Sequence, residues 1–230
     1  MTKEYTSQEI KLFKKLNSPK KIQDYLNSLK INFEEKGDTV MSPRFVIKNK
    51  TAHCMEGALL AAAVLEFHGA KPLVMDLRSE DHDFDHVVAV FKQFGHWGTV
   101  SKTNHAVLRY REPIYQSIRE LAMSYFHEYF DGKGRKTLRE YSRLFNLRYF
   151  DARPLLISPL KGEKNAVPSP RRARGLGRDE NWRTTSQNLF VIPDYLDEIK
   201  HFSILNKRQI KSLRKADKIE IMAGELVEWK

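Results

Sequence analysis

The chain has 230 residues, 41% of them hydrophobic, and a formal net charge of +11. This length fits one large domain, or one domain with an appendage, and the apolar content excludes a wholly disordered chain. No apolar run approaches the ~20 residues that cross a bilayer, and the N-terminus lacks the apolar region of a secretory signal, so we expect a cytoplasmic protein without a membrane partner. The single cysteine, Cys54, excludes an internal disulfide framework and a cysteine-based zinc finger.

The first 30 residues predict two short helices. Thr6 or Ser7 can cap the first helix, and Ser18 followed by Pro19 is typical of the start of the second. Residues 31–50 show no clear period, and we expect irregular structure there.

The middle of the chain predicts a helix followed by a hairpin. The Ala- and Leu-rich segment 51–67 predicts the clearest helix. Residues 71–77 predict a buried strand, and after a polar loop residues 86–91 and 97–101 predict two antiparallel strands.

The second half of the chain is more varied. Apolar residues at helical spacing predict a long amphipathic helix over 113–130, with its aromatic side chains in the core. Near the C-terminus we expect a helix over 207–216 and a docked strand over 226–229.

Composition divides the chain into three parts. Residues 1–157 form the expected main domain, 158–187 a basic loop or linker rich in Pro, Gly and Arg, and 188–230 a small extension that packs on the core. The linker offers an anion- or nucleic-acid-binding alternative, although no nucleic-acid motif accompanies its charge. This alternative would use Arg171, Arg172, Arg174 and Arg178.

Cys54 occupies a position that suits a nucleophile. A thiol at a helix N-terminus meets the positive end of the helix dipole and several unpaired N–H groups, which favour the thiolate. The same N–H groups could stabilise an oxyanion on an acylated sulfur. The alternative is a buried, inert cysteine.

A thiolate nucleophile needs a base, and the base needs an orienting group. Among eight histidines, His86 is the best candidate because it opens an apolar strand directly after a polar loop. His53 adjoins Cys54, but successive helical residues point about 100° apart, which makes it the weaker candidate.

The orienting group should lie on the strand that pairs with that of His86. One hairpin register places Ser101 opposite His86, and a slip by two residues places Thr103 there while keeping Ser101 on the same face. A slip by one residue favours Lys102 or Asn104 instead. Ser101 is therefore the first candidate, and Asn104 the alternative.

The order of these residues resembles the transglutaminase-like superfamily of cysteine acyl-transfer proteins, which share a papain-like core. The resemblance implies an α+β fold in which the helix that carries the cysteine packs on an antiparallel sheet. Members show a cysteine that opens a small-residue helix, a glycine near its end, a histidine at a strand start, and a tryptophan followed four residues later by an aspartate. Cys54, Gly69, His86 and Trp97 follow this order, and Ser101 stands where the aspartate is usual.

The resemblance to the superfamily covers roughly residues 45–105. The local sequences at 53–58, 83–86 and 109–113 further resemble an uncharacterised bacterial group of this superfamily, and that likeness extends to about residue 150.

The resemblance implies a cysteine-dependent hydrolase or acyltransferase that needs no cofactor. Cys54 would attack the carbonyl of a protein, peptide or small amide substrate, and His86 would activate the thiol; hydrolysis is preferred over cross-linking. A neutral Ser101 stabilises imidazolium less than a carboxylate does, although the asparagine of papain-like enzymes shows that a neutral group can serve. A catalytically inactive binding module is the alternative.

The loop 81–86 is a rival candidate because it is dense in ligand-type side chains, including three aspartates and two histidines. Such a loop could hold a hard cation. However, Asp81 and Asp83 stand where the His-x-His-x-Asp-His motif of metallo-hydrolases has histidines. We therefore expect no metal.

Overall fold

The computed structural model describes residues 4–35, 37–151 and 181–224. Its strands are β1 (Lys30–Ile31), β2 (Thr51–Ala52), β3 (Leu73–Arg78), β4 (His86–Gln93), β5 (His96–Val100), β6 (Arg111–Tyr115), β7 (Glu140–Ser142), β8 (Phe145–Asn146) and β9 (His201–Ser203). Its α-helices are α1 (Ser7–Lys15), α2 (Pro19–Ser28), α3 (Pro43–Asn49), α4 (Cys54–Phe67), α5 (Ile118–Met123), α6 (Val191–Glu198), α7 (Lys207–Lys211) and α8 (Lys218–Ala223).

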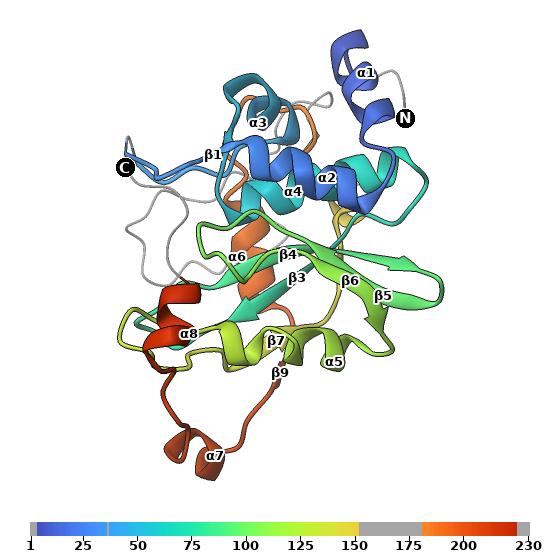
Figure 1. Cartoon of the computed structure of the whole chain (residues 1–230). Coiled ribbons are helices and arrows are strands. Elements are labelled where there is room, and N and C mark those ends of the chain that lie inside the picture. The colour runs from blue at the N-terminus through green and yellow to red at the C-terminus, as the bar shows by residue number, and fades with distance from the viewer. Residues whose placement is uncertain (1–3, 36, 152–180, 225–230) are drawn as a thin grey trace.

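The described residues form an α+β fold, as the sequence predicts. A seven-stranded antiparallel sheet has the order β6-β5-β4-β3-β7-β9, with β8 also paired to β3. Figure 1 shows α2 and α4 on one side of this sheet and α5 on the other. The predicted hairpin is confirmed, with Gln93 paired to His96 and Ala89 to Val100.

Two apolar layers cover the two faces of the sheet. Along β4, Val87 and Ala89 pack in the layer that contains α4, while Val88 and Val90 pack in the layer that contains α5. This alternation follows from the two-residue period of a strand. Because both faces are covered, β4 is apolar on successive residues from Val87 to Phe91.

The first two predicted helices are confirmed together with their caps. The Thr6 side chain accepts a hydrogen bond from the Glu9 amide, and the Ser18 side chain accepts one from the Lys21 amide. The expectation of irregular structure over 31–50 was wrong for residues 43–49, which form α3. This helix begins with Pro43 at its first position and buries Val46 completely.

The start of α4 differs from the prediction by three residues. Thr51 and Ala52 instead pair in parallel with Lys30 and Ile31. His53 is the N-cap residue and has an extended backbone (φ −95°, ψ −172°). Cys54 is therefore the first helical residue, at the point where the chain turns from a strand into a helix.

The predicted long helix over 113–130 was wrong, because only Ile118–Met123 is α-helical and Phe126–Glu128 form a separate 3₁₀ turn. Residues Arg111–Tyr115 form β6, which pairs with β5 and satisfies backbone groups that an unpaired edge would expose. Pro113 is compatible with an edge strand because it needs no N–H partner. Helix α5 then starts at a new cap, where Ser117 accepts from the Glu120 amide. The aromatic residues Tyr125 and Tyr129 are buried, as predicted.

The segment after residue 180 belongs to the main core. Trp182 is fully buried, and α6 adds Ile192 and Leu196 to the apolar layer that contains α4. The sequence prediction places Trp182 and Arg183 in the linker, but an ion pair between Arg183 and the buried Glu66 fixes them (2.6 Å). Arg183 also pairs with Asp151 at 2.7 Å.

Several predictions in the C-terminal half concern residues outside the described ranges. These are the basic cluster Arg171, Arg172, Arg174 and Arg178 and the strand over 226–229. The predicted helix over 207–216 is present but shorter, as α7. No helix in the described ranges has the length and apolar character needed to span a membrane.

Replacing Arg183 with alanine should lower the free energy of unfolding by about 3–5 kcal/mol, because it leaves Glu66 buried with part of its charge uncompensated. Urea unfolding followed by circular dichroism measures the change. Arg214→Ala is the control, because Arg214 pairs with Asp217 on the surface, and it should cost less than about 1 kcal/mol. Equal losses in the two variants would contradict a structural role for the buried pair.

Candidate active site

The site is a cavity of about 490 Å³ at the start of α4 and β4. Cys54 and His53 line it from α4 and its cap, and His86 lines it from β4. Asn104 and His105 line it from the segment that follows β5. Aromatic and acidic side chains form further parts of the wall: Phe33, Glu34, Asp83, Phe84, Asp85, Tyr129, Phe130 and Asp131.

The structure brings the two predicted catalytic side chains together. The imidazoles of His53 and His86 both lie within hydrogen-bonding reach of the Cys54 thiol. Burial alone raises the pKa of Cys54, but hydrogen bonds from the two histidines and their positive charge outweigh it and lower the pKa to about 5. Such a thiol is a thiolate at neutral pH, which is the reactive form of cysteine.

His86 is held by the sheet at its backbone but not at its outer ring nitrogen. Its main chain pairs with Leu77, and its ring packs against the edge of Tyr125, with the ring centres 6.4 Å apart. The residue is 5% exposed. Its Nε2 atom is buried and has no hydrogen-bond partner among the described residues.

Ser101 makes other contacts than the predicted one. Its hydroxyl donates to the Leu108 carbonyl (3.0 Å), and its backbone bonds the side chain of Gln23. The observed register, continued past Val100, would place Thr103 opposite His86. No hydrogen bond between Ser101 and His86 is present in the described structure, so the orienting role predicted for Ser101 finds no support here.

The segment that contains Ser101 and Asn104 lies directly against α4. A Cβ atom on Gly57 would sit 2.5 Å from Cβ of Lys102, so a glycine is required for this close approach. The Lys102 ammonium donates to the Leu29 carbonyl. This packing sets the distance between Cys54 and the segment that carries Asn104, which remains the alternative orienting residue.

His53 is a second histidine of the site, and the sequence ranks it below His86. In a helix its side chain would point about 100° away from that of Cys54, but its extended backbone lets its ring lie beside the sulfur of the next residue. Its Nε2 lies 2.9 Å from the Thr39 carbonyl. The spacing His53-x-x-Glu56 carried the missing signal, because a glutamate three residues after a cap marks the helix start.

The pKa of His53 is raised. Burial alone lowers it, but the hydrogen bond and negative charge of Cys54, the charge of Glu56 and the Thr39 carbonyl together raise it to about 9. A thiol pKa of about 5 and an imidazole pKa of about 9 define a thiolate–imidazolium pair over the intervening pH range.

Glu56 is a fully buried carboxylate in the first turn of α4. It accepts hydrogen bonds from the backbone amides of Met41 (2.9 Å) and His53 (3.1 Å) and from the Thr39 hydroxyl (2.8 Å). The Asn32 side-chain amide donates a further bond (3.1 Å). These bonds fix the loop that carries Thr39 against the residue before Cys54.

The carboxylates of the acidic loop point to different partners. Asp83 accepts from the Thr137 hydroxyl, whereas Asp85 lies with Asp76 and Asp197, all three offering ligand atoms within 4.8 Å of one another. Asp76 already accepts a hydrogen bond from His201 (3.0 Å). Of the loop 81–86, only Asp85 belongs to this group of three aspartates in the described part of the chain.

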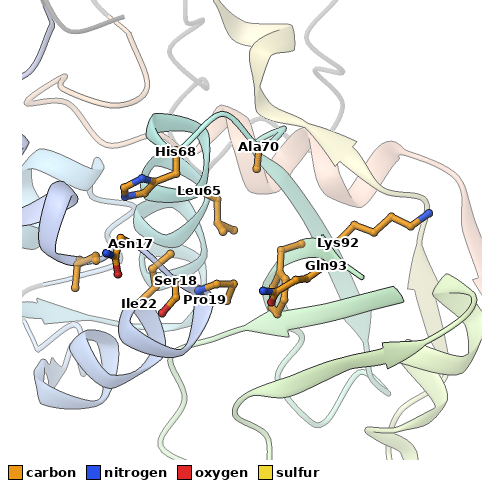
Figure 2. A pocket seen from close by; sticks show the side chains of 11 residues that line it. Asn17, Ser18, Pro19, Ile22, Leu65, His68, Ala70, Lys92 and Gln93 are labelled. Atoms are coloured by element: carbon orange, nitrogen blue, oxygen red, sulfur yellow. The ribbon is translucent and has the colours of Figure 1, made fainter. Parts of the chain in front are cut away.

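A second cavity, of about 160 Å³, lies at the opposite end of α4 (Figure 2). Ser18, Pro19 and His68 line it together with the end of β4. His68 bonds the Phe13 carbonyl (2.8 Å), as a packing histidine does. No cysteine lines this cavity.

No protein-family model and no curated protein matches the chain. The interpretation of the site therefore depends on its own residues. These are an accessible, acidic thiol at a helix start and two imidazoles beside it.

Alkylation of Cys54 by iodoacetamide should already be fast at pH 6, with an inflection at about pH 5, because the thiolate is the reacting species. The alkylation rate is measured from pH 4 to pH 9 by quenching the reaction at successive times and quantifying the adduct by mass spectrometry. Cys54→Ser, which removes the single thiol, controls for reaction elsewhere. An inflection near the value of about 8.5 of an ordinary cysteine would contradict the ion pair.

Gly57→Ala should destabilise the protein by about 1–3 kcal/mol, because the new methyl group overlaps the Lys102 side chain. Alanine in place of glycine inside a helix ordinarily stabilises by roughly 0.5–1 kcal/mol, so the expected sign is reversed. Thermal unfolding of Gly57→Ala and of the unchanged protein measures the difference in stability. Gly132→Ala, where no atom lies within 4 Å of the added carbon, should have little effect.

Proposed function

We propose that the protein is a cysteine-dependent amide or peptide hydrolase, or an acyltransferase, of the transglutaminase-like type. The observation that carries the proposal is the Cys54 thiol, whose pKa is lowered to about 5 at the start of α4, in a cavity that it shares with two imidazoles. The order of Cys54, His86 and Trp97 along the chain, and the α+β fold, agree with this superfamily.

The chemistry begins with attack of the Cys54 thiolate on a substrate carbonyl. A bond forms between sulfur and the carbonyl carbon, and the carbonyl electron pair moves onto oxygen. The first N–H groups of α4 lie next to this sulfur and can donate to the oxyanion. When the oxyanion collapses, the leaving group departs with a proton from an imidazole, and a thioester remains.

The second half of the reaction releases the acyl group from the sulfur. Water attacks the thioester in a hydrolase, and an amine attacks it in a transferase; an imidazole takes the proton of the attacking group in both cases. Hydrolysis is the preferred reaction, because no residue of the site marks an amine acceptor. His86 is the imidazole that the family resemblance assigns, and His53 is the second one within reach.

A catalytically inactive binding module is the second candidate. The unpartnered Nε2 of His86 and the bond of the Ser101 hydroxyl to Leu108 favour it, because within the described residues no side chain bonds that nitrogen to orient the strand histidine. In that case the cavity would bind a protein or peptide without cleaving it.

Incubation with p-nitrophenyl acetate should separate these candidates. We expect acetylation of Cys54, seen by mass spectrometry after an acid quench, with release of p-nitrophenolate in more than one turnover. Hydroxylamine should remove the acetyl group, as it does from a thioester. Cys54→Ser should show neither the adduct nor turnover.

The unfolded protein in urea is the second control, since it retains the thiol but loses the cavity. Fast alkylation by iodoacetamide in the folded protein, combined with no acetyl turnover, would favour the binding module. Equal acetylation of folded and unfolded protein would overturn the proposed function.

A further inference from the structure

Two imidazoles flank the Cys54 sulfur, and the structure supports them unequally. The Nε2 atom of His86 is buried with no hydrogen-bond partner among the described residues. The Nε2 atom of His53 lies 2.9 Å from the Thr39 carbonyl oxygen. A histidine that exchanges protons with a thiol needs a group that fixes its tautomer, and His53 has that group.

The Thr39 contact sets the tautomer of His53. A carbonyl oxygen only accepts hydrogen bonds, so Nε2 of His53 carries the hydrogen. The other ring nitrogen, Nδ1, is then the acceptor in the neutral ring. Since the same ring also bonds Cys54, Nδ1 is the atom available to receive the thiol proton.

Negative charge surrounds the protonated form of this ring. Oε1 of Glu56 lies 3.5 Å from Nε2 of His53, and Oε1 of Glu34 lies 3.7 Å from it. The His53 side chain is 20% exposed and that of Glu56 is fully buried, so water screens this interaction only in part. Carboxylates placed in this way stabilise imidazolium, as the aspartate of a catalytic triad does.

We propose that His53, rather than His86, is the imidazole that exchanges the proton with Cys54. Thr39 and Glu56 then take the orienting role that the family resemblance gives to a residue on the neighbouring strand. The inference rests on the proposed function for its place in a reaction, but the proton exchange itself is a property of the resting protein.

The proton balance follows from this pair. The thiol proton moves to Nδ1 of His53, which leaves a thiolate and an imidazolium. As the sulfur–carbon bond forms and the carbon–nitrogen bond of the amide breaks, the leaving nitrogen takes that proton and the ring becomes neutral. The neutral ring then removes a proton from the water that attacks the thioester carbon. The sulfur–carbon bond breaks, the carboxylic acid leaves, and the thiolate and the imidazolium are restored.

Other titratable groups face the pair from each neighbouring element. His86 from β4 adds a hydrogen bond to the sulfur, and its positive charge, when present, also lowers the thiol pKa. The Asp85 carbonyl oxygen lies 3.9 Å from the sulfur. Tyr129 stays neutral because burial and nearby negative charge, including that of Cys54, raise its pKa well above its usual value.

The alkylation profile of two matched variants tests the assignment. In His53→Gln, the inflection should move from about 5 most of the way toward the value of about 8.5 of an ordinary cysteine. In His86→Gln it should move by less, because the Glu34 and Glu56 charges remain next to His53. His68→Gln, at the far end of α4, should leave it unchanged.

The opposite order of the two variants would overturn the proposal. A large change in His86→Gln with none in His53→Gln would assign the proton exchange to His86. These profiles do not depend on turnover, so they distinguish failure of this inference from failure of the proposed function, which the acetylation experiment reports.

Histidine NMR in the Cys54→Ser variant provides a second measurement, which does not require changing the cap residue. Removing the thiolate should lower the pKa of His53 from about 9, because the two groups stabilise each other's charge. An unchanged His53 titration in this variant would also overturn the proposal.

Discussion

The site depends on a buried carboxylate that must have its hydrogen bonds satisfied. Glu56 is completely buried, and a charge in that position is tolerated only when several donors surround it. Two of those donors, Thr39 and Met41, lie on the loop before α3, and a third is the amide of His53. One side chain therefore fixes the helix start, the loop beside it and the residue that precedes Cys54.

The sheet adds the second requirement, which is that groups from two layers meet at one end. Helix α4 packs on the face of β4 that carries Val87 and Ala89. His86 lies on the opposite face, together with Val88 and Val90. Cys54 and His86 each occupy the first position of their element, so they meet where β4 and α4 both begin. Gly57 allows the segment with Lys102 to close the cavity against the helix.

Local signals in the sequence were reliable where neighbouring residues decide the structure. Ser18 and Pro19 mark the start of α2, because the cap and the proline act within one turn. The helix expected over 113–130 was wrong at its start, because an unpaired edge of β5 recruits residues 111–115 through backbone bonds that helical periodicity does not report. The position of Trp182 likewise depends on a distant residue. Its neighbour Arg183 pairs with Glu66, which is more than 100 residues away in the chain.

The sequence by itself determined the nucleophile candidate, because one cysteine at a helix start needs no further information, and it selected His86 from its place at a strand start. Only the tertiary structure decided which groups support that thiol. The pKa of Cys54 reflects its burial and the nearby rings of His53 and His86, and the pKa of His53 reflects its burial, Cys54, Glu56 and the Thr39 carbonyl. These groups come together only after the loop, the helix and the sheet have packed.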